Sequence, residues 1–265
     1  MENKIVFLGT GGDEAVIGKQ LRRSGGILLL ADGMQFHINP GPGALNCLAE
    51  HNINVRETTA IFVSDILLKN SNDTMALVES MTLNGMDTKG VLVTNDTAIK
   101  GTDDYLPIIS PKHKRFLERV LVVNEDQKLA IGPIEIVVLP GRSKTPTIGF
   151  KFLTEFFTMA YLSDTAYSGK FKELLQEVDV MIINISQPFG KESEDSMDCD
   201  TAAKIINETK PKIVILTGFS AKILKEDPRL IAREFHKKTG IQAIAADDGL
   251  VLKPQSFLSR KKVNQ

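Results

Sequence analysis

The order in which strands and helices follow one another constrains the fold of this chain most strongly. Apolar, strand-like segments with few helices between them fill the sequence as far as Leu162, and helix and strand alternate after that point. The order fits neither a pure β-sandwich, which has no alternating part, nor a doubly wound parallel sheet, which alternates throughout. It predicts two sheets that face each other, with helices on the outside.

The separate elements are predicted from hydrophobic periodicity and from turn and cap residues. The dipeptide Asp32-Gly33 favours a tight hairpin between two strands, and Gly132-Pro133 marks another turn. The expected strands are 4–8, 26–31, 34–38, 59–64, 91–94, a series within 120–139, 147–153, 156–162, 179–184, 212–217 and short strands at Ala243 and Leu250. The expected helices are 44–51, 73–84, a short one after Pro111, 167–177, 200–208 and 228–239.

Nothing in the sequence divides the chain into separate units. No linker rich in glycine, serine or proline interrupts it, and no internal repeat is evident. We therefore expect residues 1–265 to form a single domain. The polar run 191–196 is expected to be a solvated loop.

Composition and the N-terminus predict a cytoplasmic protein without a membrane segment. The longest apolar run, from Ile27 to Ala31, is far too short to cross a bilayer, and the first residues do not resemble a signal peptide. Two cysteines, Cys47 and Cys199, suit a reducing compartment and make no disulfide framework. The formal net charge is −1, so overall charge does not favour binding to nucleic acid.

The glycine-rich run Gly9-Thr-Gly-Gly12 follows a strand and invites comparison with nucleotide-binding loops. A dinucleotide fingerprint needs a third glycine and an immediate helix, whereas here Asp13 and Glu14 follow and would repel phosphate. The sequence contains no Gly-Lys-Ser or Gly-Lys-Thr triplet, so a P-loop is excluded. We expect a strand-to-loop turn whose glycines need positive φ.

Seven motifs in a fixed order are more specific than any one of them. They are Phe7-Leu-Gly-Thr-Gly-Gly12, Ile38-Asn-Pro-Gly-Pro-Gly-Ala44, Ile61-Phe-Val-Ser64, Thr145-Pro-Thr-Ile-Gly-Phe150, Tyr161-Leu-Ser-Asp164, Lys210-Pro-Lys-Ile-Val-Ile-Leu-Thr217 and Ala246-Asp-Asp-Gly249. Over nearly the whole chain this series resembles the metallo-β-lactamase superfamily, nearest to its ribonuclease-Z-like and phosphodiesterase-like branch. The resemblance implies an α/β (α+β) fold, a four-layer αββα sandwich, with the loops at 41–43 and 64–70 on one edge.

In the resembled family, a His-X-His-X-Asp-His signature follows the strand that corresponds to residues 61–64. It begins a site for two zinc ions, whose shared hydroxide attacks an ester or a lactam. The resemblance places the four ligand positions on Asp65, Leu67, Lys69 and Asn70. None of them is histidine, Leu67 has no donor atom, and Lys69 brings a positive charge. We therefore predict that the zinc site has been erased.

The remaining ligand positions of the family lead to the same prediction. A histidine before the Pro-Thr-Ile-Gly run corresponds to Arg142, Ser143 or Lys144, and one after the next-to-last strand corresponds to Gly218. The histidine that some members carry before the helix at Asp200 falls near Met197. Only the bridging carboxylate remains, at Asp164. The chain's histidines, His37, His51, His113 and His236, all lie away from these positions. We expect no metal and no cofactor.

The carboxylates that remain allow two interpretations. Asp164 and Asp65 could join Asp73, Asp247 or Asp248 in an oxygen site for a hard cation such as Mg²⁺. Alternatively, Asp164 pairs with a basic side chain, Lys69 or Arg142, whose positive charge neutralises the carboxylate in place of the metal ions. We favour the second interpretation.

Three functions remain open. The first is a non-catalytic ligand-binding or regulatory protein, alone, as a homo-oligomer or beside an active paralogue. It would keep the old cleft, with Arg142, Ser143 and Lys144 as candidate residues for a small anionic ligand. The second is an atypical hydrolase of the phosphodiesterase or nuclease kind that uses an oxygen-ligated metal or none. The third is a nucleic-acid-binding module that uses Lys69, Arg142 and Lys144.

Overall fold

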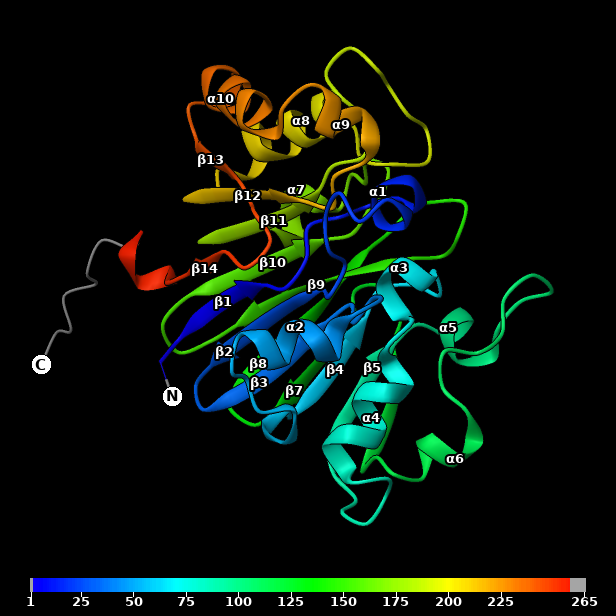
Figure 1. Ribbon diagram of the computed structural model, residues 1–265. Coiled ribbons are helices and arrows are strands. Elements are labelled where there is room, and N and C mark those ends of the chain that lie inside the picture. The colour runs from blue at the N-terminus through cyan, green and yellow to red at the C-terminus, as the bar shows by residue number, and fades with distance from the viewer. Residues whose placement is uncertain (1, 258–265) are drawn as a thin grey trace, which may run out of the picture.

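Two seven-stranded sheets form the centre of the molecule in the computed structural model, which describes residues 2–257 (Figure 1). The strands of the first sheet lie in the order β14 (Val251–Leu252), β1 (Lys4–Phe7), β2 (Ile27–Ala31), β3 (Met34–Ile38), β4 (Ala60–Val63), β5 (Val91–Thr94) and β6 (Arg119–Val122). Those of the second lie in the order β13 (Gln242–Ala245), β12 (Ile213–Thr217), β11 (Val180–Asn184), β10 (Thr158–Leu162), β9 (Ile148–Leu153), β8 (Ile134–Pro140) and β7 (Lys128–Ile131). Every expected strand is present.

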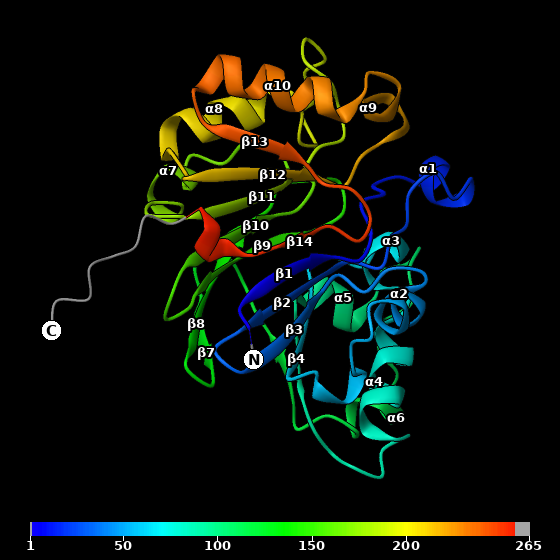
Figure 2. The same ribbon diagram turned by 60° about the vertical axis from the view of Figure 1, so that its left-hand side comes forward.

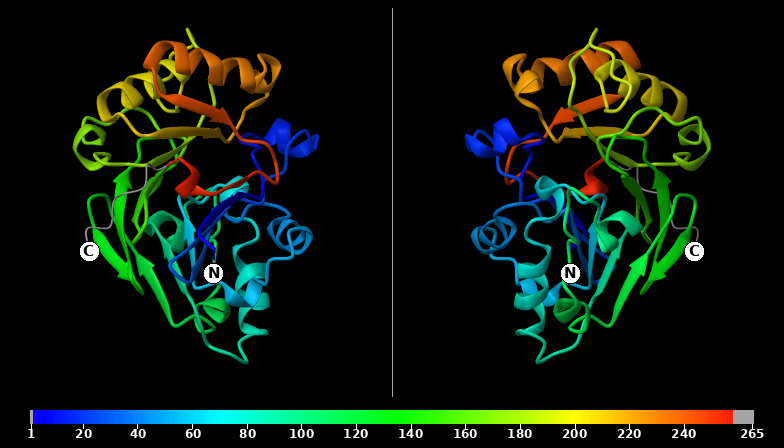
Figure 3. Two further views of the ribbon diagram at one scale, coloured as in Figure 1. Left: turned by 90° about the vertical axis from the view of Figure 1, so that its left-hand side faces the viewer. Right: turned by 90° about the vertical axis from the view of Figure 1, so that its right-hand side faces the viewer.

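Helices cover the outer face of each sheet and complete the predicted four layers (Figures 2 and 3). The first sheet carries α2 (Ala44–Glu50), α4 (Thr74–Thr82), α5 (Asp96–Lys100) and α6 (Pro111–Lys114). The second carries α7 (Phe171–Leu174), α8 (Cys199–Thr209), α9 (Ala221–Lys225) and α10 (Pro228–Thr239). The short helices α1 (Glu14–Gly18) and α3 (Leu68–Ser71) lie near the edge where the loops meet, and 3-10 turns occupy Val55–Glu57 and Pro254–Ser256.

The strands are apolar on both faces because each face is covered. On β1, Ile5 and Phe7 join the core between the sheets, whereas Val6 joins the core under the helices of the first sheet. On β11, Ile182 lies between the sheets and Ile183 lies under the helices of the second sheet. This alternation follows from the two-residue period of a strand, and it explains why the strands read as continuous apolar runs.

Local sequence signals set several of the boundaries. Asp32 and Gly33 adopt φ of 50° and 79°, the conformation of the type I′ turn that was expected between β2 and β3. Helix α10 begins at Pro228, after the cap residue Asp227, and ends at Thr239, before the cap residue Gly240, whose φ is 72°.

Several other elements differ from what the sequence predicted. The segment expected as a loop at 64–70 contains α3, because the Asp65 side chain accepts hydrogen bonds from the Leu67 N–H and the Asn70 amide. The helix expected at 167–177 is only Phe171–Leu174, because Tyr167 instead contacts α8, where its hydroxyl donates to Glu208. Helices α1, α5 and α9 were not expected. Within residues 2–257, none of the helices combines the length and apolar character needed to span a membrane.

The buried imidazole of His37 is expected to make the free energy of unfolding depend on pH. It is fully buried on β3, its Nε2–H donates to the Gly25 carbonyl over 2.8 Å, and Nδ1 has no partner among the described residues. Burial lowers the pKa of His37 from 6.5 to about 4. The neutral ring is therefore favoured in the folded state, so its stabilising contribution is complete above pH 6.5 and is lost as the pH falls towards 4. We expect this loss to reach about 3 kcal/mol.

Urea unfolding at a series of pH values checks this expectation. The variant His37→Gln cannot take up a proton, so its free energy of unfolding should fall less between pH 6.5 and 4 than that of the natural chain. Equal falls in the two proteins would contradict the assignment.

Candidate functional site

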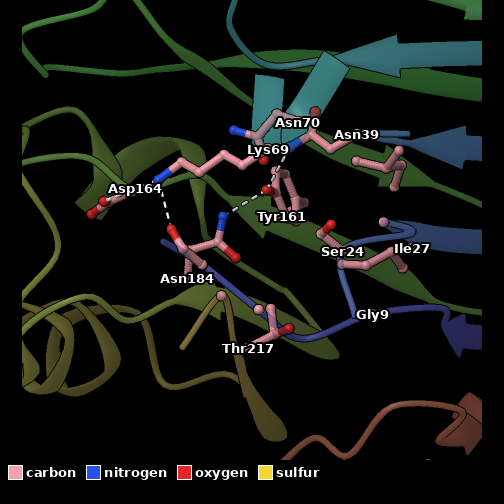
Figure 4. Close-up of a pocket in the computed structure, with 15 residues that line it drawn as sticks. Gly9, Ser24, Ile27, Asn39, Lys69, Asn70, Tyr161, Asp164, Asn184 and Thr217 are labelled. Atoms are coloured by element: carbon pink, nitrogen blue, oxygen red, sulfur yellow. Dashed lines mark hydrogen bonds and ion pairs between the residues drawn. The ribbon is translucent and has the colours of Figure 1, made fainter. Parts of the chain in front are cut away.

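Polar residues that follow the strands gather at one edge of the two sheets. Asn39 follows β3, Asp65 follows β4 and Asp164 follows β10, while Asn184 ends β11. Side chains from both sheets face a cavity of about 30 Å³, and Lys69 reaches it from α3 (Figure 4). The loops at 41–43 and 64–70 meet here as predicted, because Gly41 packs against the backbone of Lys69.

Asp65 is a structural residue at the base of this site. Its side chain is buried, and four donors surround its carboxylate. They are Ser64 Oγ at 2.8 Å, Asn70 Nδ2 at 2.7 Å, Thr147 Oγ1 at 3.3 Å and the Leu67 N–H at 3.0 Å. Burial raises the pKa of Asp65, and the hydrogen bonds oppose this shift.

Lys69 supplies the cation that was expected beside Asp164. Its Nζ donates to the Gly12 carbonyl over 2.8 Å and lies 4.0 Å from Asp164 Oδ2. The other oxygen of Asp164 accepts from Ser186 Oγ at 3.0 Å and from the Met197 N–H at 2.8 Å. Burial raises the pKa of Asp164, and the charge of Lys69 opposes this shift. The ammonium thus joins the N-terminal glycine loop, α3 and the loop after β10.

Tyr161 stands at the centre of a cluster that the sequence analysis missed. Its hydroxyl oxygen lies 2.7 Å from Asn39 Nδ2 and 2.6 Å from Asn184 Nδ2, and the side chain is almost fully buried. Asn39 is held in turn by Ser64, whose N–H donates to Asn39 Oδ1 over 2.8 Å. Burial raises the pKa of Tyr161 well above its usual range, so the phenol stays protonated. Asn39 and Asn184 both lie where a buried strand ends, and this feature of the sequence could have identified them as candidates.

The basic loop before β9 does not take part in the site. The side chains of Arg142 and Lys144 are exposed, and Lys144 Nζ lies 3.7 Å from Asp195. Only the backbone of Arg142 approaches the site, through its hydrogen bonds with Thr165 and Ala166. The alternative pairing of Arg142 with Asp164 was therefore wrong, and neither Arg142, Ser143 nor Lys144 lines the cavity.

The oxygen site considered for a hard cation is not assembled. Asp73 accepts from the Ala44 N–H at the start of α2. Asp247 pairs with Arg22 at 2.7 Å, and Asp248 accepts from Thr10. Each carboxylate is thus engaged away from Asp164. Across the part of the chain that the structure describes, no three His, Cys, Asp or Glu side chains come close enough to hold a metal ion.

The structure at Gly218 leaves no room for the histidine that the family carries at the corresponding position. Its φ is 63°, and a Cβ atom there would lie 2.4 Å from Asn184 Oδ1. The amide of Asn184 therefore lies in the space that a side chain at position 218 would need.

The run Gly9-Thr-Gly-Gly12 needs glycine for a different reason from the positive φ that was expected. Gly9, Gly11 and Gly12 do not have positive φ, and each donates its N–H to a backbone carbonyl. A Cβ atom would lie 2.5 Å from the Arg23 carbonyl carbon at Gly9 and 1.9 Å from the Gly218 oxygen at Gly12. The glycines permit close approach of neighbouring segments, and their N–H groups are not free to cradle a phosphate.

These side chains do not fit a pair of zinc ions. Zinc in proteins is held by imidazole, thiolate and carboxylate groups. At the corresponding positions only Asp65 and Asp164 carry such a group, and Asp65 already accepts four hydrogen bonds. The Lys69 ammonium has no lone pair and would repel a divalent ion.

Comparison with known proteins supports the resemblance seen in the sequence. An uncharacterized protein of Methanocaldococcus jannaschii is 27% identical over 253 residues, which are 94% of each chain. Similar solved structures include the metallo-β-lactamase fold protein YhfI of Bacillus subtilis, with 16% identity, a TM-score of 0.78 and 95% and 99% of the two chains covered. The short form of human tRNase Z has 14% identity, a TM-score of 0.69 and coverage of 94% and 98%. Zn²⁺-bound PqqB of Methylobacterium extorquens has 11% identity, a TM-score of 0.69 and coverage of 94% and 99%.

At these identities the structures establish the fold and nothing about the chemistry. Residues 35–219 match the family described as the beta-lactamase superfamily domain. This match spans more than half of the sequence, and the two packed sheets with outer helices agree with it. The chain therefore belongs to the beta-lactamase superfamily.

Proposed function

We propose that this chain is a non-catalytic member of its superfamily, which binds a ligand or a partner and does not hydrolyse a substrate with two zinc ions. The observation that carries the proposal is the place of Lys69, whose Nζ lies 4.0 Å from the one ligand-type carboxylate that remains exposed to the cavity, Asp164. A relative of the same fold is described as Zn²⁺-bound. Here a tethered ammonium supplies positive charge beside that carboxylate.

The arrangement of the carboxylates supports the same proposal. An unpaired buried carboxylate is costly, and a lysine close to it reduces that cost without any ion from solution. Asp65 accepts four hydrogen bonds, and the charge of Lys69 also favours its ionised form. We propose that the protein acts as a regulatory protein or as a subunit, with a second copy or an active paralogue as its partner.

Elemental analysis tests the proposal directly. We expect the protein, purified after growth with added zinc and manganese, to hold far less than one equivalent of either metal. It should not hydrolyse bis(p-nitrophenyl) phosphate, with or without a chelator. The physical reason is that a divalent ion at the cleft would meet the Lys69 ammonium and only one free carboxylate.

The variant Asp164→Asn is the matched control. Metal held at chance sites on the surface would be equal in the variant and the natural chain. One equivalent of metal that Asp164→Asn removes, together with chelator-sensitive turnover, would overturn the proposed function.

A further inference from the structure

We propose that the cavity beside Lys69 receives a neutral amide group of a ligand, such as a primary carboxamide. The proposal rests on the non-catalytic function above and names the chemistry that the cleft would recognise. Its first support is charge. Among the described residues that line the cavity, Lys69 and Asp164 are the charged ones, and their charges cancel. An anion would gain little from Lys69 because Asp164 would repel it.

Hydrogen-bonding capacity beside Lys69 is the second support. An ammonium has three hydrogens, and the Gly12 carbonyl takes one of those on Lys69. Asp164 Oδ2 accepts no hydrogen bond from residues 2–257, and the 4.0 Å between it and Nζ is too long for a direct one. The cavity therefore offers a cationic donor and an anionic acceptor side by side. A group that carries both C=O and N–H can satisfy the two at once.

The Tyr161 cluster supplies a second donor for the carbonyl oxygen. If the Asn184 amide donates to Tyr161, the phenol hydrogen has no acceptor among the described residues. If the amide is turned around, its oxygen accepts from the phenol over the same 2.6 Å, and its NH₂ group faces the cavity. In both orientations a neutral donor is left over, on Tyr161 or on Asn184, and Figure 4 shows both side chains in the lining of the cavity that Lys69 reaches. A carbonyl oxygen accepts two hydrogen bonds, which matches this pair of donors.

Three probes of nearly equal shape test the chemistry. Acetamide offers both C=O and N–H, acetate offers two acceptors and a negative charge, and acetone offers an acceptor alone. We expect acetamide, in titrations followed by protein NMR, to shift the signals of residues around the cavity at lower concentration than acetate or acetone. A crystal soaked in acetamide should show the amide oxygen toward Lys69 and the nitrogen toward Asp164 Oδ2.

The variant Asp164→Asn removes the negative charge and leaves Lys69 uncompensated. We expect it to reverse the preference, with the ratio of acetate to acetamide affinity rising about tenfold or more, as for a gained charge-assisted hydrogen bond. Lys144→Ala, a change on the exposed loop, should leave both affinities unchanged. If Asp164→Asn does not fold, the comparison of probes on the natural chain still decides.

Tighter binding of acetate than of acetamide to the natural chain would overturn the ligand proposal. Water alone in the soaked cavity would also overturn it, and so would acetamide binding that Asp164→Asn leaves unchanged, which marks an adventitious additive only. These failures differ from failure of the proposed function, which would show itself as metal bound through Asp164. A metal-free protein that ignores acetamide would refute the ligand proposal and leave the non-catalytic function standing.

Discussion

Replacement of Lys69 by methionine is expected to lower the free energy of unfolding by about 2 kcal/mol. The change keeps most of the side-chain volume and removes the ammonium that lies between the Gly12 carbonyl and Asp164. Loss of one partner of a fully buried ion pair costs roughly 3–5 kcal/mol, and the effect here is smaller because Asp164 keeps 26% exposure and the pair is separated by 4.0 Å. Denaturant unfolding at neutral pH measures the difference.

Two further variants make this measurement specific. Lys144→Met removes a lysine that is 85% exposed and should change stability by no more than about 0.5 kcal/mol. The double variant Lys69→Met with Asp164→Asn should cost less than the sum of the two single changes, because the carboxylate left alone by the first change is neutralised by the second. If Lys69→Met changes the free energy of unfolding as little as Lys144→Met does, the contacts of Lys69 with Gly12 and Asp164 do not stabilise the fold.

Introduction of histidine at Gly218 is expected to destabilise the fold by at least about 3 kcal/mol and to restore no metal binding. The new Cβ atom would lie 2.4 Å from Asn184 Oδ1, and the backbone φ of 63° is unfavourable for a side chain. Displacement of Asn184 would also break its hydrogen bond with Tyr161. Histidines restored at Asp65, Leu67 and Asn70 would meet the same obstacle whenever Gly218 is part of the set. Thermal and denaturant unfolding report the loss.

The variant Gly190→His separates the two causes of the expected loss of stability, which are the collision with Asn184 and the strain of a positive φ. Gly190 has φ of 71° and open space where a Cβ atom would go, so its replacement adds backbone strain without a collision. We expect it to cost about 1–2 kcal/mol, clearly less than Gly218→His. Shortening Asn184 to alanine in the Gly218→His background should recover part of the lost stability. Equal costs at the two glycines would contradict a collision with Asn184.

The four-layer fold could be predicted from the sequence, and so could the types of residue at the positions that correspond to the family's ligands. Short continuous apolar runs predict strands that are covered on both faces, and Asp32-Gly33 predicts a hairpin because few dipeptides adopt two positive φ values. Coordination chemistry depends on the type of residue, so Leu67 and Lys69 exclude imidazole ligands at their positions whatever conformation the chain adopts.

The tertiary structure alone decided which residues share the site. Three cations near the former ligand positions were equivalent in the sequence, and only Lys69 approaches Asp164, because α3 directs it inward while the loop that carries Arg142 and Lys144 leaves their side chains exposed. Tyr161 and Asn39 are 122 residues apart and meet across the two sheets. The type of each residue is a local property, whereas hydrogen bonds, collisions and charge pairs between distant segments depend on how the two sheets pack against each other.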